Sequence, residues 1–213
     1  MTTGEHDEHF DDCVRHYDSC YGSAGIDDLD FYVGMAQQSE GATVEIACGT
    51  GRILLRCAAA GVRAHGIDIW PKTVEVLAAQ HRAMAPSSRE LATFELGDAR
   101  NFHLEFAPAL ITMPFHSLQY ICSWQEQLAA LKCIAKHMDE SCLFAFDVFQ
   151  VPDFGRFSVT GNEVVDATWE CAQDPKVAVE RTYTRQRVDY FRQVLYGLYT
   201  YRSYQEGELI REE

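Results

Sequence analysis

The chain has 213 residues, of which 47% are hydrophobic, and this composition indicates one globular chain with a full-sized core. Eighteen basic residues against 32 acidic ones give a net charge of −14, which argues strongly against a general binder of nucleic acid. No apolar run is long enough to span a membrane, and the acidic N-terminus does not read as a signal peptide. The eight cysteines form no C-x-x-C pair, so we expect reduced thiols in a cytoplasmic protein.

The first two thirds of the chain alternate between short apolar runs and helical segments. An amphipathic stretch at 27–38 predicts a helix that Asp27 or Asp28 would cap. Ser123 and Glu126 form a capping box for a later helix. The expected strands are 43–47, 62–69, 91–96, 109–113 and 142–149, and the expected helices among them are 52–60, 72–84 and 124–137. This alternation predicts an α/β fold with a doubly wound, mainly parallel sheet.

Beyond Pro152 the pattern changes to period-two alternation with no helix in between. Segments 157–169, 177–185 and 188–204 predict an antiparallel meander, with turns at Asp174-Pro175 and at Gln186. The expected fold is therefore Rossmann-like, with an appended antiparallel β meander.

A glycine turn links the first expected strand to the helix that follows it. Residues 44–52 read V-E-I-A-C-G-T-G-R, and glycines at such a turn let a ligand approach the backbone. The N-terminus of the following helix would offer N–H groups to a carboxylate or phosphate. A dinucleotide fingerprint needs a third glycine at position 54, where this chain has Leu54, so a nicotinamide-dependent oxidoreductase is disfavoured.

Acidic residues follow the neighbouring strands at the same edge of the predicted sheet. Asp68 ends the second strand, where a carboxylate can accept both hydroxyls of a ribose, and Asp98 follows the third strand. Taken singly, Glu45, Asp68 and Asp98 would fit a strand-end acid, a helix cap and a turn residue. Their order and spacing together favour a nucleotide-cofactor site.

In that order the residues resemble the class I S-adenosylmethionine-dependent methyltransferases, whose first motif runs (D/E)-x-G/A-x-G-x-G. The resemblance implies S-adenosyl-L-methionine as the cofactor, with its ribose at Asp68 and its adenine beside Ile69, Asp98 and Ala99. The loop that begins near Met113 would border the methionine end. The other implied cofactor-binding residues belong to the first motif: Glu45, Ala47, Cys48, Gly49, Gly51 and Arg52.

Two further segments resemble small-molecule methyltransferases of the sugar-amine and glycine N-methyltransferase type. They are Tyr17-Asp with Tyr21-Gly, and the sequence P-F-x-S-L-Q-x-I after the fourth strand. Tyr17 and Tyr21 would then touch the methionine moiety or the substrate, although they could equally be aromatic anchors of a first helix. His116 and Tyr120 are the candidates for a catalytic base. Neither matches the family pattern cleanly.

The implied function is methyl transfer to a small-molecule amine or hydroxyl, without a metal. The alternatives are a catalytically impaired relative that still binds the cofactor and, less favoured, the oxidoreductase. His6, His9 and His16 lie in an acidic tail and make a weak metal motif. Asp147 ends the fifth strand, where it could border the substrate or be a polar strand end.

We expect three regions: a tail and cap helix at 1–40, an S-adenosylmethionine-binding domain at 41–150, and an antiparallel substrate cover at 151–213. Relatives of this type continue with a helix and two further strands. The expected sheet therefore has an exposed edge, which the meander or a second subunit in a homodimer could cover.

Overall fold

The computed structural model describes residues 14, 16–21, 28–150, 161–171 and 174–213. The chain divides into two compact units. The α/β unit is Asp27–Phe149, and the β unit combines Met1–Ile26 with Gln150–Glu213. The first expected region, 1–40, is shared between them, since the helix over 29–38 belongs to the α/β unit.

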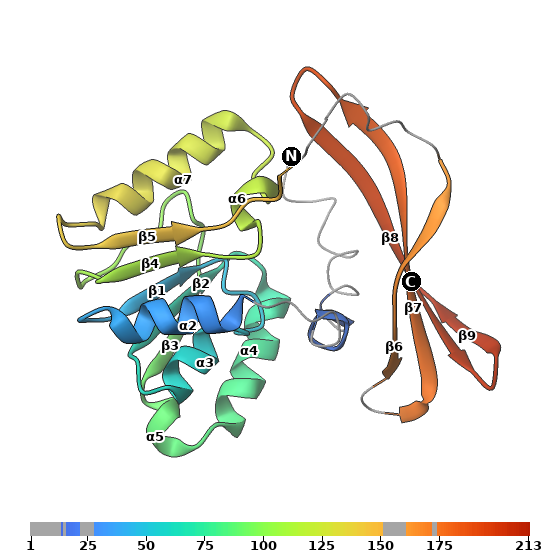
Figure 1. Cartoon of the computed structure of the whole chain (residues 1–213), viewed down its shortest axis with the longest axis horizontal. Helices are drawn as coiled ribbons and strands as arrows, with labels where there is room; N and C mark the ends of the chain where they lie inside the picture. Colours follow the sequence, from blue (N-terminus) through green and yellow to red (C-terminus); the bar gives the residue numbers. More distant parts are fainter. Residues whose placement is uncertain (1–13, 15, 22–27, 151–160, 172–173) are drawn as a thin grey trace. The chain divides into compact units, whose positions relative to one another are not determined.

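The α/β unit is built on a five-stranded sheet with the order β3-β2-β1-β4-β5 (Figure 1). All four pairings are parallel, which confirms the predicted doubly wound architecture. The strands are β1 Thr43–Ile46, β2 Ala64–Asp68, β3 Ala92–Leu96, β4 Leu110–Met113 and β5 Leu143–Phe146. The order reverses between β1 and β4, and in open α/β sheets ligands bind at the carboxyl ends of the strands beside such a reversal.

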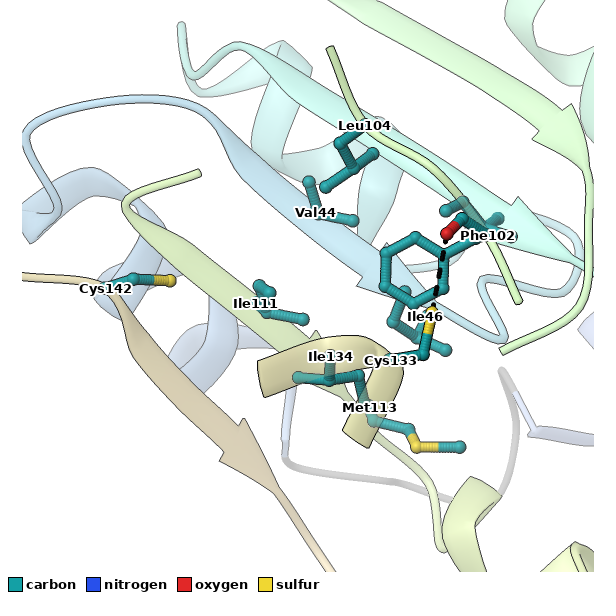
Figure 2. Packing of buried hydrophobic residues seen from close by; sticks show 10 residues of the cluster. Val44, Ile46, Phe102, Leu104, Ile111, Met113, Cys133, Ile134 and Cys142 are labelled. Atoms are coloured by element: carbon teal, nitrogen blue, oxygen red, sulfur yellow. Dashed lines mark hydrogen bonds between the residues drawn. The ribbon is translucent and has the colours of Figure 1, made fainter. Parts of the chain in front are cut away.

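Helices cover both faces of this sheet (Figure 1). They are α2 Leu29–Gln38, α3 Leu54–Ala59, α4 Pro71–Ala83, α5 Pro86–Arg89, α6 Ser117–Tyr120 and α7 Trp124–Lys136. One core cluster packs α7 against β1 and β4 through Ile134, Val44 and Ile111 (Figure 2). A second cluster packs α2, α3 and α4 against the opposite face. The central strands are therefore buried on both faces.

The central strand β1 and the edge strand β5 differ in how far their side chains are buried. All four residues of β1 are buried, including Glu45, because both of its faces are covered. Val44 and Ile46 face α7, so alternation directs Glu45 toward the α2 and α3 side. By contrast, β5 is an edge strand and leaves Leu143 and Phe146 exposed.

The two shortest helices were not predicted from sequence. α5 and α6 have four residues each, within segments where no helix was expected, and one turn carries no amphipathic period. The helix predicted at 52–60 is shorter than expected, because it begins at Leu54 and has six residues. The backbone before Leu54 belongs to the glycine turn.

The β unit contains an antiparallel sheet with the order β6-β7-β8-β9. Its strands are β6 Glu163–Cys171, β7 Asp174–Asp189, β8 Val194–Gln205 and β9 Glu208–Glu212. The predicted turn at Gln186 was wrong: β7 continues through it with a register shift between Arg185 and Arg187. A bulge inserts one unpaired residue, which explains why the apolar alternation changes parity there. The reversal occurs at residues 190–193 instead.

A short helical segment at 16–21 packs on this antiparallel sheet within the β unit. Its Cys20 forms a buried cluster with Trp169, Val179 and Tyr201. The ring of His16 stacks on Tyr201 at a centroid distance of 4.9 Å. Its Nε2 lies 3.1 Å from the Oε2 atom of Glu213, so His16 is part of the packing of this unit.

Candidate functional site

The turn after β1 is built from residues in the left-handed region. Ala47, Gly49 and Gly51 have φ angles of 57°, 55° and 89°. A Cβ on Gly51 would lie 2.4 Å from the Cδ1 atom of Leu77, so both the backbone and the packing require glycine there. A Cβ on Gly49 would meet no described atom within 4 Å. The turn is therefore tightly packed at Gly51 and has open space beside Gly49.

The missing third glycine has a structural counterpart on the neighbouring strand. Leu54, which stands at the position of that glycine, is fully buried at the start of α3. It packs over Gly66 of β2, where a Cβ would lie 2.7 Å from both Leu54 Cδ2 and Cys48 Sγ. The close approach of helix and sheet is thus provided by a glycine on the strand instead of one on the helix.

Asp68 joins the carboxyl end of β2 to the glycine turn. Its Oδ2 atom accepts a hydrogen bond from the backbone N–H of Gly49 at 2.7 Å. Its Oδ1 atom accepts from the N–H of Trp70 at 2.9 Å and from the hydroxyl of Thr73 at 2.8 Å. A carboxylate has about four lone-pair positions, so these three bonds leave room for one more donor. Beside it, Ile69 is 43% exposed and offers an apolar surface.

Glu45 is a buried carboxyl group with one oxygen left without a partner. It is 4% exposed, and within the described part of the chain no hydrogen-bond donor reaches its Oε2 atom. Burial raises the pKa of Glu45 to about 8, and the carboxylates of Asp68 and Asp28 act in the same direction. The guanidinium of Arg52 and a hydrogen bond from the backbone N–H of Leu54 oppose this rise. An additional cation or donor at Oε2 would stabilise the ionised form.

Arg52 connects the turn to α2 and to the loop after β4. Its guanidinium donates to both carboxylate oxygens of Asp28, at 2.5 and 2.6 Å, and lies 5.6 Å from the ring centroid of Phe115. Of the two expected caps of α2, Asp28 occupies the cap position, but its side chain makes no cap hydrogen bond. A bidentate pair with an arginine is the stronger interaction.

Asp98 follows β3 and is held by Arg100. The Nε atom of Arg100 lies 2.9 Å from Oδ1 of Asp98, and Nη2 lies 2.5 Å from Oδ2. Hydrogen bonds from Arg100 hold the pKa of Asp98 below its usual range. Arg100 also pairs with Glu126, which lies in the first turn of α7. Ser123 accepts from the N–H of Glu126 at 3.4 Å, so this part of the predicted capping box is present. Ala99 lies between Asp98 and Arg100 and is half-buried.

The loop after β4 carries the two candidates for a base. Met113 packs in the core with Ile134 (Figure 2), so its side chain is 1% exposed. His116 has a φ of 58°, and its Nδ1 atom lies 2.7 Å from Oδ1 of Asp147. Tyr120 ends α6 and is 72% exposed. The structure thus places His116 beside a carboxylate and Tyr120 at the surface.

Tyr17 and Tyr21 belong to the β unit, and their expected place beside the cofactor stays a prediction. Their rings are 4.7 Å apart in an edge-to-face arrangement. The Nη1 atom of Arg181 donates to the hydroxyl of Tyr21 at 2.9 Å, and its Nε donates to Asp166 at 2.7 Å. Burial raises the pKa of Tyr21, so this hydroxyl stays protonated near neutral pH.

Sequence reasoning missed three contacts within the α/β unit. The hydroxyl of Thr73 donates to Asp68, and the guanidinium of Arg52 donates to Asp28. The hydroxyl of Tyr32 donates to Asp147 at 2.7 Å. Each joins residues from different elements, and only the position of Asp147 at a strand end gave a signal. Among the described residues, no helix is long and apolar enough to cross a membrane, and no group of three or more His, Cys, Asp or Glu could hold a metal.

Comparison with known proteins finds a family match over part of the chain. Residues 44–141 match the family described as a methyltransferase domain. No curated protein matches the chain. Several solved structures have a similar fold. A sugar N-methyltransferase from Streptoalloteichus sp. has a TM-score of 0.67 at 19% identity, with 92% of this chain and 74% of that chain covered.

Two more solved structures show the same likeness. An amino pentose methyltransferase from Micromonospora echinaspora, solved with S-adenosylmethionine bound, has a TM-score of 0.69 at 18% identity, with coverages of 92% and 78%. DesVI from Streptomyces venezuelae has a TM-score of 0.65 at 18% identity, with coverages of 100% and 81%. At such identities the likeness establishes the fold. The family match over residues 44–141 identifies this sheet and turn as a methyltransferase domain.

Proposed function

We propose that the chain transfers a methyl group from S-adenosylmethionine to the amine of a small molecule. The observation that carries the cofactor part is the buried Oε2 of Glu45, which has no partner among the described residues and lies in the strand that leads into the glycine turn. A buried carboxylate in this state calls for a cation. S-adenosylmethionine supplies an α-ammonium group and a sulfonium charge, so Glu45 is the residue that would hold its methionine end.

The remaining predicted contacts would bind different parts of the cofactor at the ends of different strands. Asp68 has room for one ribose hydroxyl in addition to its three protein donors. Ile69 would face the adenine ring, and Asp98 with Ala99 would bind its edge. Ala47, Cys48, Gly49, Gly51 and Arg52 would then surround the methionine end, with the open space at Gly49 on the ligand side.

An amine acceptor is supported by the similarity of the fold to enzymes described as a sugar N-methyltransferase and an amino pentose methyltransferase. The net charge of −14 also favours a cationic acceptor over an anionic one. When bound, S-adenosylmethionine supplies a methyl group that is already activated by the positive sulfur. The protein has to orient the amine and exclude water, and orientation alone can contribute about 7–11 kcal/mol.

An amine that arrives as an ammonium ion must lose a proton before it can act as a nucleophile. His116 is the candidate that receives this proton at Nε2, because its Nδ1 faces Asp147. Tyr120 is the second candidate, and its exposed position makes it the weaker one. The proton then passes from His116 to water after the transfer.

Thermal-shift titration with S-adenosylmethionine, S-adenosylhomocysteine and NAD tests the cofactor. We expect stabilisation by the first two ligands and no shift with NAD, whereas a shift with NAD alone would contradict the assignment. Radiolabelled methyl transfer to an amino pentose, compared with the pentose that carries a hydroxyl in place of the amine, tests the acceptor. Transfer to the amine supports the proposal. Transfer to the hydroxyl only, or cofactor binding without any transfer to amine or hydroxyl acceptors, contradicts it.

A further inference from the structure

The carboxylate of Asp147 accepts hydrogen bonds from two other parts of the α/β unit, α2 and the loop after β4. The hydroxyl of Tyr32, from α2, donates to Oδ2 at 2.7 Å. The backbone N–H groups of Phe115 and His116, in the loop after β4, donate to Oδ2 at 2.7 Å and to Oδ1 at 2.8 Å. The fourth contact is the imidazole Nδ1 of His116, 2.7 Å from Oδ1. This one side chain therefore joins the carboxyl ends of β4 and β5 to α2.

The loop that Asp147 holds has a strained backbone. Phe115 and His116 both have a φ of 58°, and neither is a glycine. A left-handed residue of this kind costs on the order of 1 kcal/mol or more, and two in succession are unusual. Such a conformation persists only when surrounding contacts enforce it. The two N–H groups of these residues are the ones that Asp147 accepts, so the carboxylate stabilises the strained turn directly.

The same carboxylate decides which nitrogen of His116 carries a proton. The Nδ1 atom is buried, and within the described residues it has no aligned hydrogen bond, only the close contact with Oδ1 of Asp147. A bare nitrogen lone pair would be repelled by a carboxylate at that distance. The neutral ring is therefore stable with its hydrogen on Nδ1, which leaves Nε2 as the nitrogen that can accept a proton.

We propose that Asp147 is a positioning residue for the methyl transfer, which holds the loop after β4 and fixes His116 in the Nδ1–H form. This rests on the proposed function, in which Nε2 of His116 receives a proton from the acceptor ammonium ion. The resulting amine forms the new N–C bond with its lone pair, and the C–S bond breaks with its electron pair left on sulfur. The imidazolium that His116 becomes is stabilised by the charge of Asp147.

Other charged and titratable groups lie around Asp147 and His116. Tyr32 contacts Asp147 from α2, and burial followed by this hydrogen bond raises the pKa of the Tyr32 hydroxyl. Arg52 lies over the ring of Phe115 and is paired with Asp28, while Glu45 approaches Tyr32 from β1. Burial raises the pKa of Asp147, but the hydrogen bonds from Tyr32, His116 and Phe115 outweigh it and hold this pKa below its usual range. Asp147 is therefore ionised at neutral pH.

The tautomer of His116 is the direct readout, and it needs no acceptor. In the full chain labelled with ¹⁵N-histidine, long-range ¹H–¹⁵N spectra distinguish the two neutral forms, and His116→Gln assigns the signal. We expect the Nδ1–H form in the wild type and a mixture in Asp147→Ala. Asp139→Ala, which changes the acid before β5 instead of the acid after it, should keep the wild-type pattern. An Nε2–H form in the wild type would overturn the proposal even if Asp147→Ala does not fold.

Kinetics with an amino pentose provide the second readout. His116→Gln should lower kcat by about a hundredfold, and Asp147→Ala by about tenfold or more, with KM for S-adenosylmethionine changed less than threefold. Because Asp147 acts through His116, the double variant should be no slower than His116→Gln, and effects that multiply would overturn the proposal. Full activity of His116→Gln would contradict the proposed base instead, and the tautomer spectra still report separately on Asp147.

Discussion

The carboxylate of Asp68 accepts the backbone N–H of Gly49 at 2.7 Å, so the end of β2 holds the glycine turn in place. The acid expected to bind a ribose is therefore also a structural part of the turn. Its two other donors, Trp70 and Thr73, belong to the start of the α4 segment, and together they keep the carboxylate in one orientation. Cofactor affinity and turn geometry should both depend on this side chain.

Asp68→Ala should weaken the binding of S-adenosylmethionine at least tenfold. A charged hydrogen bond is worth roughly 1.5–3 kcal/mol, and the loss of the Gly49 contact adds to it. Titration calorimetry measures this affinity. Thr73→Val, which removes one donor from Asp68 but keeps the carboxylate, should change the affinity by less than threefold. An unchanged affinity in Asp68→Ala would rule out the ribose assignment.

The two glycines of the turn should differ in their tolerance of a methyl group. Gly49→Ala should lower the free energy of unfolding by about 1 kcal/mol, which is the cost of a left-handed φ, because the space beside Gly49 is open. Gly51→Ala adds a collision with Leu77 and should lower the free energy of unfolding by about 2–4 kcal/mol. Denaturant unfolding compares the two variants. Equal losses would show that the packing at Gly51 is not as tight as the structure has it.

Leu54 and Gly66 should show strong coupling. Gly66→Ala alone should cost about 1–3 kcal/mol, because its methyl would press on Leu54 and on Cys48. In a Leu54→Ala background the added methyl meets less resistance, so the double variant should be more stable than the sum of the singles predicts, by about 1 kcal/mol. Unfolding free energies of the four proteins complete this cycle, and strict additivity would contradict the packing described.

Glu45 should make the stability of the ligand-free protein depend on pH. Its pKa is raised from 4.5 to about 8 in the folded state, mainly by burial, so the folded chain binds more protons than the unfolded chain between these values. The stabilisation of the folded state by protonated Glu45 is fully present below about pH 4.5 and is lost as the pH rises toward 8. The free energy of unfolding should fall by at most about 1.4 kcal/mol per pH unit in this range. Unfolding between pH 5 and 8 measures the slope, and Glu45→Gln should reduce it.

The fold and the order of the site residues could be read from the sequence because both depend on local patterns. The apolar runs and the glycine turn placed β1 through β5 correctly within about two residues at most ends, and a parallel sheet then brings the strand ends to one edge. The bulge at Gln186 shows the limit of such patterns. A change of parity is compatible with a turn or with a bulge, and only the pairing of β7 with β8 distinguishes them.

The contacts of the site depend on pairs that are far apart in the sequence. Asp28, one of the two expected caps of α2, occupies the cap position, but its carboxylate pairs with Arg52, 24 residues later. Asp147 is 115 residues from Tyr32 and 31 from His116, so no local pattern could indicate that it holds both. Strand ends were identified as site positions by topology, whereas the partners at each position required the folded structure.

Glu45 is the group proposed to receive the cationic end of S-adenosylmethionine. Titration calorimetry at pH 7, in two buffers of different ionisation enthalpy, measures affinity and proton release together. Because Glu45 is largely protonated at pH 7 without ligand, the wild type should release close to one proton per ligand bound. Glu45→Gln should release none and bind roughly tenfold to a hundredfold more weakly. Equal affinity of the two proteins, without proton release from the wild type, would contradict the account.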